Sequence, residues 1–382
     1  MQYSFRLAEL LGHVPDPRKR PGTIKTIVEY TGLDRHQVAA LLKNEVKYIP
    51  LKALSRLCDY LIENGHASAA ELPGALFAIE PENFWELMAR RSRLELCVGV
   101  RRDVEADSPE ISYVVASDSV LLGELLNGVT TLGGTAKHQK ENKPDPVGHR
   151  AIPHPEHLKQ SLVWSPGQAS AQEIRSRADS IYQEFSESKA DKGLIAIGST
   201  KSNPVVELIL ANSFNCEPFV SQDGIQNPKQ RNIPFFIRYR DNDPHPNSCA
   251  GGLKLSSSMP SEQPGIYYEG NDGKWHCAPA NEREECAFVC YVHRESQGRL
   301  EMVMGGFSGR ATRLLARTLA TDAQEFWPPT FEGQGVMAGA YIVSYNLGTN
   351  SKTSSDILST EISATMKTVP VSAEALGRAL LR

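Results

Sequence analysis

Two short segments combine an apolar strand, a turn of small polar residues and a helix, an order that can direct backbone N–H groups at an anion. In the first, the apolar run Leu194–Ile197 precedes the turn GSTKS at 198–202. Asn203 is a natural N-cap, and Pro204 suits the first helical position. Because a helix N-terminus is positively polarised, the turn suits a phosphate or carboxylate. The candidate ligands are Ser199, Lys201, Ser202 and Asn203. A purely structural turn is the alternative, and the spacing of a P-loop is absent.

The second segment has the strand Leu300–Met304, the turn GGFSG at 305–309 and then a helix. Glycines permit close approach of the backbone to a ligand. Arg310, Arg313 and Arg317 share one helical face, and Arg310 opposes the helix dipole, so an anionic partner is expected. A solvated basic face is the alternative, and the dinucleotide fingerprint is not met. The candidate ligands here are Gly305, Gly306, Ser308, Gly309, Arg310 and Arg313.

Other residue types that perform chemistry do not form a recognisable set. Carboxylates at Glu207, Asp223 and Asp241 are possible catalysts, but no paired spacing connects them. The histidines between positions 138 and 157 lack regular ligand spacing. The group Cys277, Cys286, Cys290 and His293 suggests zinc, yet two of its cysteines lie in or beside the apolar run AFVCYV, which favours buried cysteines. The sequence therefore predicts neither a metal nor a cofactor and assigns no catalytic residue.

The elements that position these turns indicate an α/β domain with a mixed, partly parallel sheet of Rossmann-like type. Alternating strand and helix patterns extend from residue 93 to 347, around an exposed loop at about 135–167 that is rich in Pro, His and Lys. In such sheets ligands bind at the carboxyl ends of the strands, where both turns would lie. Further elements are expected as follows: a helix at Ala169–Ser186, short strands at Phe235–Tyr239, Gly265–Tyr268 and Ala287–His293, and a helix at Ala373–Leu381.

Composition sets the class of protein. The chain has 382 residues, which suggests two or three domains, and a net charge of -4, which gives no global sign of nucleic-acid binding. Seven scattered cysteines do not form a disulfide framework. No signal peptide and no apolar run long enough for a membrane span is visible. We therefore expect a cytoplasmic, soluble protein without a membrane partner.

The first 66 residues have the spacing of a small all-helical domain. Helices are expected at Tyr3–His13 and at Leu51–Glu63. Between them, two more helices are expected, the first capped by Thr23 and the second by Asp34. The residues expected to face inward are Ile24, Ile27, Val28, Val38, Leu41, Leu42, Leu54, Leu57, Cys58, Leu61 and Ile62. Helical structure is also expected over Ala67–Ala89, with a break at Pro81 before the run NFWELMARR. This order of helices predicts a separate N-terminal domain.

The segment TIKTIVEYTGLDRHQVAALLKNEVKYIPLKALSRLCDYL resembles the Cro/C1-type (XRE-like) helix-turn-helix family. Gly32 and Leu33 match the turn of that motif and Val38 its buried recognition-helix position, while the closing helix is matched by Leu54, Leu57 and Leu61. The resemblance covers less than a fifth of the chain. It implies binding to double-stranded DNA by the helix that follows Asp34.

The resemblance also implies roles for individual residues. Arg35 is expected to bind a guanine, and His36 and Gln37 bases or phosphate. Ala40 stands where relatives often place a polar base reader, which implies either a narrower sequence readout or a shift toward contacts with the thymine methyl group. Residues 1–70 carry ten Lys or Arg and seven Asp or Glu, so this segment is basic although the chain is acidic. The residues expected at phosphates are Thr23, Lys43, Asn44, Lys47 and Tyr48.

These patterns predict a helix-turn-helix domain at 1–66, a helical connector at 67–92, an α/β ligand-binding domain at 93–347 and a C-terminal tail at 348–382. The predicted function is a sequence-specific transcriptional regulator, acting as a homodimer, whose α/β domain senses a small, anionic or nucleotide-like ligand. One alternative is an enzyme acting on nucleotides or phosphorylated sugars, with the helical domain as a targeting module. Another is a helical protein-interaction scaffold.

Overall fold

The computed structural model describes most of the 382 residues: 3–11, 23–43, 45–67, 69, 72, 76–79, 81–102, 112–133, 157–187, 191–221, 231–255, 263–294, 298–333, 336–347 and 364–381. They form two compact units. The first, here the N-terminal unit, comprises Met1–Glu82 with the short segments Arg294–Arg299 and Gly333–Val336, and the remainder of the chain forms the second unit.

Three helices surround the core of the N-terminal unit: α2 (Thr23–Thr31), α3 (Arg35–Leu42) and α4 (Leu51–Glu63), after a short α1 (Leu7–Leu10). Apolar side chains recur on one face of each helix at the spacing of a helical turn, and burying these faces together stabilises the three-helix arrangement. The fully buried residues include Ile27, Val38, Leu41, Leu57 and Leu61. The all-helical core expected from the sequence is therefore present.

The ends of the N-terminal unit differ from the sequence prediction. Tyr3–Phe5 is a strand, β1, that pairs antiparallel with β2 (Phe77–Ile79), so the helix predicted over residues 3–13 is wrong at its start. The helix expected before Pro81 is wrong where β2 lies, whereas the helical run expected after Pro81 is confirmed by the short α5 (Phe84–Ala89). The rings of Phe5 and Phe77 meet edge to face, with centroids 5.4 Å apart. Local periodicity cannot reveal a pairing between segments so far apart in sequence.

The inward face of α4 is also slightly rotated from the expected one. Ile62 is 37% exposed, whereas Tyr60 is buried, with its ring 5.5 Å from that of Tyr30. The aromatic contact with α2 makes Tyr60 part of the core, although it was not among the residues expected to face inward.

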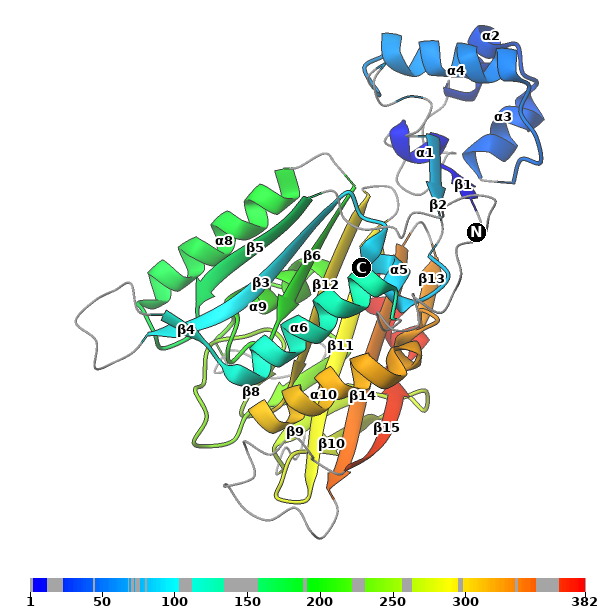
Figure 1. Ribbon diagram of the computed structural model, residues 1–382. Helices are drawn as coiled ribbons and strands as arrows, with labels where there is room; N and C mark the ends of the chain where they lie inside the picture. The colour runs from blue at the N-terminus through cyan, green and yellow to red at the C-terminus, as the bar shows by residue number, and fades with distance from the viewer. Residues whose placement is uncertain are drawn as a thin grey trace, which may run out of the picture. The chain divides into compact units, whose positions relative to one another are not determined.

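The second unit is built on a large mixed sheet, in which β13, β14, β11, β12, β6, β3 and β4 are successive neighbours, while β15 pairs with β14 and β5 with β3 (Figure 1). β3 runs parallel to both β5 and β6, whereas β4 and β15 pair antiparallel with their neighbours. The strands are β3 (Arg93–Arg102), β4 (Ser112–Val114), β5 (His157–Trp164), β6 (Lys192–Ile197), β11 (Glu284–Arg294), β12 (Arg299–Gly306), β13 (Phe331–Gly333), β14 (Val336–Leu347) and β15 (Ala364–Pro370). The predicted mixed, partly parallel sheet is confirmed.

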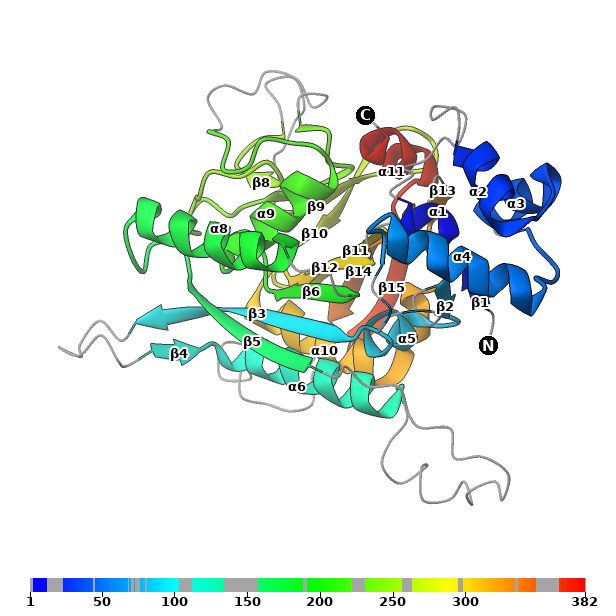
Figure 2. The ribbon, with the colours of Figure 1, turned by 90° about the horizontal axis from the view of Figure 1, so that it is seen from above.

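Helices cover both faces of this sheet. Figure 2 shows α6 (Ala116–Thr131) and α10 (Gly309–Asp322) below it, and α8 (Ala171–Glu187) and α9 (Pro204–Ser213) above it. Side chains of β6 alternate between the layers: Leu194 and Ala196 join the core under α8 and α9, and Ile195 and Ile197 join the core under α6 and α10. Burial on both faces explains why β6 is apolar from Leu194 to Ile197.

A second, four-stranded sheet has the order β10-β9-β7-β8. Its strands are β7 (Phe235–Arg238), β8 (Gly251–Gly252), β9 (Gly265–Glu269) and β10 (Trp275–Pro279). The strand expected at Ala287–His293 belongs instead to β11 of the large sheet. At the C-terminal end, after the short η6 (Ala323–Phe326) and the later strands, α11 (Ala373–Leu380) buries Leu376 and Ala379 in the core beneath α8 and α9.

Candidate functional site

The start of α3 is fixed by a reciprocal pair of hydrogen bonds. The Asp34 carboxylate accepts from the Gln37 backbone N–H at 2.8 Å, and the Gln37 side-chain oxygen accepts from the Asp34 N–H at 3.1 Å. This capping box satisfies two N–H groups that would otherwise lack partners. The helix therefore begins firmly at Arg35, and the side chain of Gln37, which the sequence placed at bases or phosphate, also holds the helix start.

The turn between α2 and α3 depends on Gly32 and Thr31. Gly32 has a φ of 74°, in the left-handed region that glycine adopts without strain. The buried Thr31 hydroxyl donates to Ile27 O at 2.6 Å and accepts from Leu33 N at 3.3 Å. Sequence reasoning identified Gly32 but missed Thr31, whose polarity gave no sign that it lies in the core.

Basic side chains on and after α3 face solvent. Arg35, His36, Lys43 and Lys47 are all exposed, and none makes an ion pair with a described carboxylate. Tyr48, 74% exposed, follows them. These side chains are available to an external partner with negative charge.

The remaining residues of this predicted surface are either half-buried or outside the described residues. Thr23 is the first residue of α2 itself and is half-buried, and Ala40 is half-buried on α3. Asn44 lies outside the described residues.

In the second unit, the turn after β6 is held together by its own polar groups. Asn203 is completely buried: its side-chain oxygen caps α9 by accepting from Val205 N at 3.0 Å. Its amide nitrogen donates to Cys97 O and Ile197 O, both at 3.0 Å, which links β3 to β6. Ser199 N donates to Ser202 Oγ at 3.1 Å. The residues predicted as ligands here thus have structural contacts as well.

Lys201 has a carboxylate partner within the unit. Its ammonium lies 2.8 Å from Asp243 Oδ2, 2.9 Å from Phe307 O and 4.1 Å from the centre of the Phe307 ring. Burial lowers the pKa of Lys201, although Asp243 opposes that shift. Because Asp243 neutralises this charge, Lys201 can bind an external anion only in competition with Asp243.

The glycines after β12 bring the two turns against each other. A Cβ on Gly305 would lie 2.4 Å from Gly198 O, and one on Gly306 would lie 2.1 Å from Thr312 N. Gly198 N donates to Met304 O at 2.9 Å, so β6 and β12 end side by side and run in the same direction. These contacts account for both glycines through packing of backbone on backbone, without a ligand.

The anionic partner expected for Arg310 is a side chain of the same unit. Arg310 Nε donates to Glu285 Oε1 at 3.0 Å, and Glu285 is buried. Ser308 caps α10 by accepting from Ala311 N at 3.2 Å. Arg313 is half-buried on the same helix, and Gly309 is exposed.

Three helix N-termini nevertheless meet at this edge of the sheet. A Cβ on Gly309 would lie 3.4 Å from Ser117 Oγ, so α10 begins beside the start of α6, and the packing of Gly305 on Gly198 brings α10 next to the turn that leads into α9. Asp118 lies in the first turn of α6, where burial raises its pKa against the effects of Ser117 and Arg101. Three positive helix ends favour an anion at this place.

The residues that sequence reasoning missed follow β7. The Arg240 guanidinium lies 4.9 Å from the centre of the Phe307 ring and forms no ion pair with a carboxylate in the described part of the chain. The exposed His245 stacks on Tyr239 at 6.1 Å with an angle of 7° between the rings. The run FFIRYRDNDPH contained the signal, because it joins a strand to alternating aromatic and basic residues.

The candidate catalytic carboxylates are not brought together. Glu207 is 1% exposed and accepts hydrogen bonds from Ser248 Oγ and from the N–H groups of Cys249 and Phe219, and its burial raises its pKa. Asp241 lies at the surface beside Arg238, at 3.1 Å. Asp223 lies outside the described residues. Glu207 thus holds two loops in place and is not accessible to a substrate.

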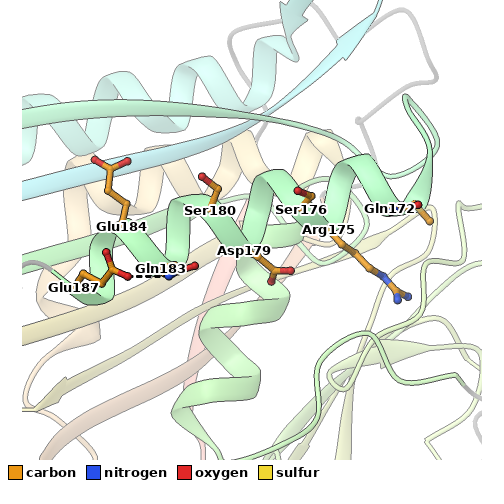
Figure 3. Close-up of a pocket in the computed structure, with 9 residues that line it drawn as sticks. Gln172, Arg175, Ser176, Asp179, Ser180, Gln183, Glu184 and Glu187 are labelled. Carbon is orange, nitrogen blue, oxygen red and sulfur yellow. Dashed lines mark hydrogen bonds between the residues drawn. The ribbon is translucent and has the colours of Figure 1, made fainter.

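A groove elsewhere on the second unit follows α8. Figure 3 shows its polar side chains, among which Gln183 donates to Glu187 at 2.8 Å. The lining residues come from this one helix and include Gln172, Ser176, Asp179 and Ser180. The groove therefore includes none of the candidate ligand residues of the two turns.

Metal-like groupings and membrane-spanning helices are not found in the described ranges. No three or more His, Cys, Asp or Glu residues there are placed to hold a metal ion. Cys286 and Cys290 are buried, and burial raises the pKa of both thiols. None of the described helices combines the length and apolarity needed to cross a membrane.

Comparison with known proteins identifies one segment. Residues 18–62 match the family model of the Cro/C1-type HTH DNA-binding domain. This match includes α2, α3 and nearly all of α4, and it confirms the resemblance seen in the sequence. Comparisons with curated proteins and with solved structures gave no match.

Proposed function

We propose that this protein is a sequence-specific transcriptional regulator of the cytoplasm that binds operator DNA through α3 and responds to a small anionic ligand bound by its α/β unit. One observation carries the proposal: on the helix that this family uses for recognition, the Cro/C1-type segment presents exposed basic side chains that make no ion pair with a described carboxylate. The mildly basic balance of residues 1–70 has the sign that DNA binding requires.

The exposed residues divide into two roles. Arg35 and His36, in the first turn of α3, read base edges in the major groove, and Gln37 assists while keeping its cap. Phosphates are bound after the helix and at the start of α2, which fixes the orientation of α3 without reading sequence. The phosphate contacts are Thr23, Lys43, Asn44, Lys47 and Tyr48.

The regulator acts as a homodimer. A single small helix-turn-helix module makes few base contacts, and two copies related by a two-fold axis read two half-sites one helical turn of DNA apart. This organisation predicts a palindromic operator.

The ligand site lies at the carboxyl ends of β3, β6 and β12. The neighbouring strands β5, β3, β6 and β12, with α6 and α10 on one face and α8 and α9 on the other, support a doubly wound, Rossmann-like arrangement. After β3 the chain leads to α6 on one face of the sheet, and after β6 it leads to α9 on the other face. This divergence creates a crevice between the carboxyl ends of the two strands. The positive ends of α6, α9 and α10, together with Arg240, favour phosphate there. His245, which is exposed and stacks on the buried Tyr239, adds a flat surface for a base, so a nucleotide fits best.

The test is selection of DNA fragments by the full chain at moderate salt, compared with Arg35→Ala and Lys43→Ala. Arg35→Ala should weaken binding to the selected motif by about 1–3 kcal/mol and relax the preference at one position. Lys43→Ala should weaken binding to all sequences alike and reduce the salt dependence. Failure to select a motif, or an unchanged preference in Arg35→Ala, would refute this assignment of the recognition helix.

The ligand site is tested separately with pyrophosphate and ATP as probes. Calorimetry should detect binding to the wild-type chain and weaker binding to Arg240→Ala, with Arg317→Ala, an exposed arginine on α10, as the matched control. Equal binding by both variants would exclude Arg240 from the site, and no binding of either probe would argue against a phosphate site.

A further inference from the structure

The second unit has an edge strand with exposed leucines. β5 pairs with β3 along its whole length, and among the described residues no strand pairs with its other side. Leu158 and Leu162 are 50% and 48% exposed, whereas Ser161 and Val163, which alternate with them, are buried. An eight-residue edge strand whose outward backbone groups face no strand in the described part of the chain, and which carries exposed leucines, is a template for another strand.

The outward-facing backbone groups of β5 follow from one hydrogen bond. Arg177 Nε donates to Leu162 O at 3.3 Å, so this carbonyl points away from β3. Because backbone groups alternate in direction along a strand, those of Leu158, Gln160 and Leu162 face outward together. The side chains of these three residues lie on the face of β5 opposite the buried Ser161 and Val163.

We propose that β5 pairs antiparallel with β5 of a second copy of this chain, around a two-fold axis that passes near Gln160. In that register Leu158 lies opposite the partner's Leu162, and Leu162 lies opposite the partner's Leu158. Directly opposite residues are the closest neighbours across two strands, so the four leucines form one apolar cluster. If the axis passed near any other outward-facing residue of β5, Leu158 and Leu162 would not both lie opposite a leucine of the second copy.

The charges of α8 agree with the same axis. Arg177 contacts Leu162, and Glu184 contacts Lys159 at 2.6 Å, so α8 and β5 run in opposite directions along each other. The point of α8 above Gln160 is therefore near Ser180, midway between Arg177 and Glu184. A two-fold axis there brings Arg177 toward the partner's Glu184, and Glu184 toward the partner's Arg177. Ser180, exposed and small, allows the two helices to approach.

A second copy is the occupant that these features select. In an isologous interface the same surface of both copies meets around a two-fold axis. β5 and α8 suit this arrangement, because their leucines and charges each meet a complementary side chain when the second copy runs in the opposite direction. This proposal rests on the proposed function in one respect: a dimer is needed to bind the two half-sites of an operator. The surface itself can be tested without DNA.

The first experiment measures self-association of the full chain by analytical ultracentrifugation. The wild-type chain should be a dimer, and Leu162→Lys should raise the dimer dissociation constant at least about tenfold, because two like charges would enter the apolar cluster. Leu381→Lys is the matched control, since Leu381 is 47% exposed and lies outside the interface. A monomeric wild-type chain, or equal effects of the two substitutions, would overturn the proposal.

The second experiment tests the register by disulfide formation under mild oxidation. Opposed Cα atoms in a hydrogen-bonded antiparallel pair lie about 5.5 Å apart, within the range of a disulfide. Gln160→Cys should therefore cross-link with its own copy. Leu158→Cys alone should not, whereas Leu158→Cys combined with Leu162→Cys should. The wild-type chain controls for its seven native cysteines. Cross-linking of Leu158→Cys alone would refute this axis.

The two proposals fail in different ways. A dimer that is sensitive to Leu162→Lys but selects no DNA motif would refute the regulator and leave the interface intact. If the protein selects a motif but its dimer dissociation constant is unchanged by these substitutions, the interface is refuted and the regulator is left intact.

Discussion

Basic residues have opposite situations in the two units. On the N-terminal unit, Arg35 and Lys43 are exposed and make no ion pair with a described carboxylate. At the sheet edge of the second unit, Lys201 and Arg310 are paired with Asp243 and Glu285. Both groups looked like candidate ligands in the sequence. The comparison teaches that a basic side chain at a helix start indicates a binding surface only when the fold has not already provided its counter-charge.

The difference follows from how each unit is stabilised. The N-terminal unit holds α3 with apolar contacts on one face and a capping box at its start, so Arg35 and His36 on its other face are exposed. The turns of the second unit lie between packed layers, where polar groups lose water and must find partners within the protein. Arg240 is the exception there, and for that reason it is the stronger candidate ligand.

The largest expected effect is that of Glu207→Ala, which removes the acceptor of three donors, two of them buried. Leaving Ser248 Oγ and the N–H groups of Cys249 and Phe219 without a partner should cost about 3–5 kcal/mol of folding free energy. Urea denaturation of the full chain measures this, with Glu187→Ala on the exposed face of α8 as control. Similar stability of the two variants would show that the buried network is dispensable.

A direct test of the comparison substitutes one lysine in each unit. Lys201→Met leaves the half-buried Asp243 carboxylate unpaired and should cost about 2 kcal/mol. Lys43→Met changes an exposed side chain and should alter stability by less than about 0.5 kcal/mol. Thermal denaturation compares them. Equal losses of stability would show that Lys201 and Lys43 do not differ in their contribution to folding.

Loss of the capping box should have a smaller and local effect. Asp34→Ala leaves the Gln37 N–H without its acceptor and should lower the stability of α3 by about 1 kcal/mol. Amide hydrogen exchange of the full chain should show faster exchange in α3, with Asp59→Ala on the exposed face of α4 as control. Unchanged exchange in α3 would mean that core packing alone fixes this helix.

The smallest effect is expected from Asp118→Asn, and it depends on pH. Burial raises the pKa of Asp118 above its ordinary value of 3.8, so wild-type stability falls as pH rises through the raised pKa and the buried carboxylate ionises. The variant has no charge to bury and should melt about 1–3 °C higher at pH 7. Below pH 3.8 the carboxyl is neutral and the difference should vanish. A difference that is independent of pH would assign the effect to packing instead.

Sequence reasoning succeeded where local pattern and tertiary role coincide. Val38, Leu41 and Leu42 have helical spacing and are buried, and Asp34 has the type and position of an N-cap and is one. It failed where distant segments meet: β1 pairs with β2, and Tyr60 is buried by Tyr30. The candidate anion site lies between these cases, because its turns and caps were visible but Asp243, Glu285 and Arg240 lie far from those turns in the chain.

By itself, the sequence determined the helix-turn-helix segment, the alternation of strands and helices, and the positions of the caps, because each depends on residues within a few positions of one another. Only the tertiary structure decided the order of the strands, the meeting of three helix starts, the partners of Lys201 and Arg310, and the position of β5 at the edge of the described sheet. The physical reason is that burial and charge pairing are properties of what surrounds a residue, and most of those neighbours come from elsewhere in the chain.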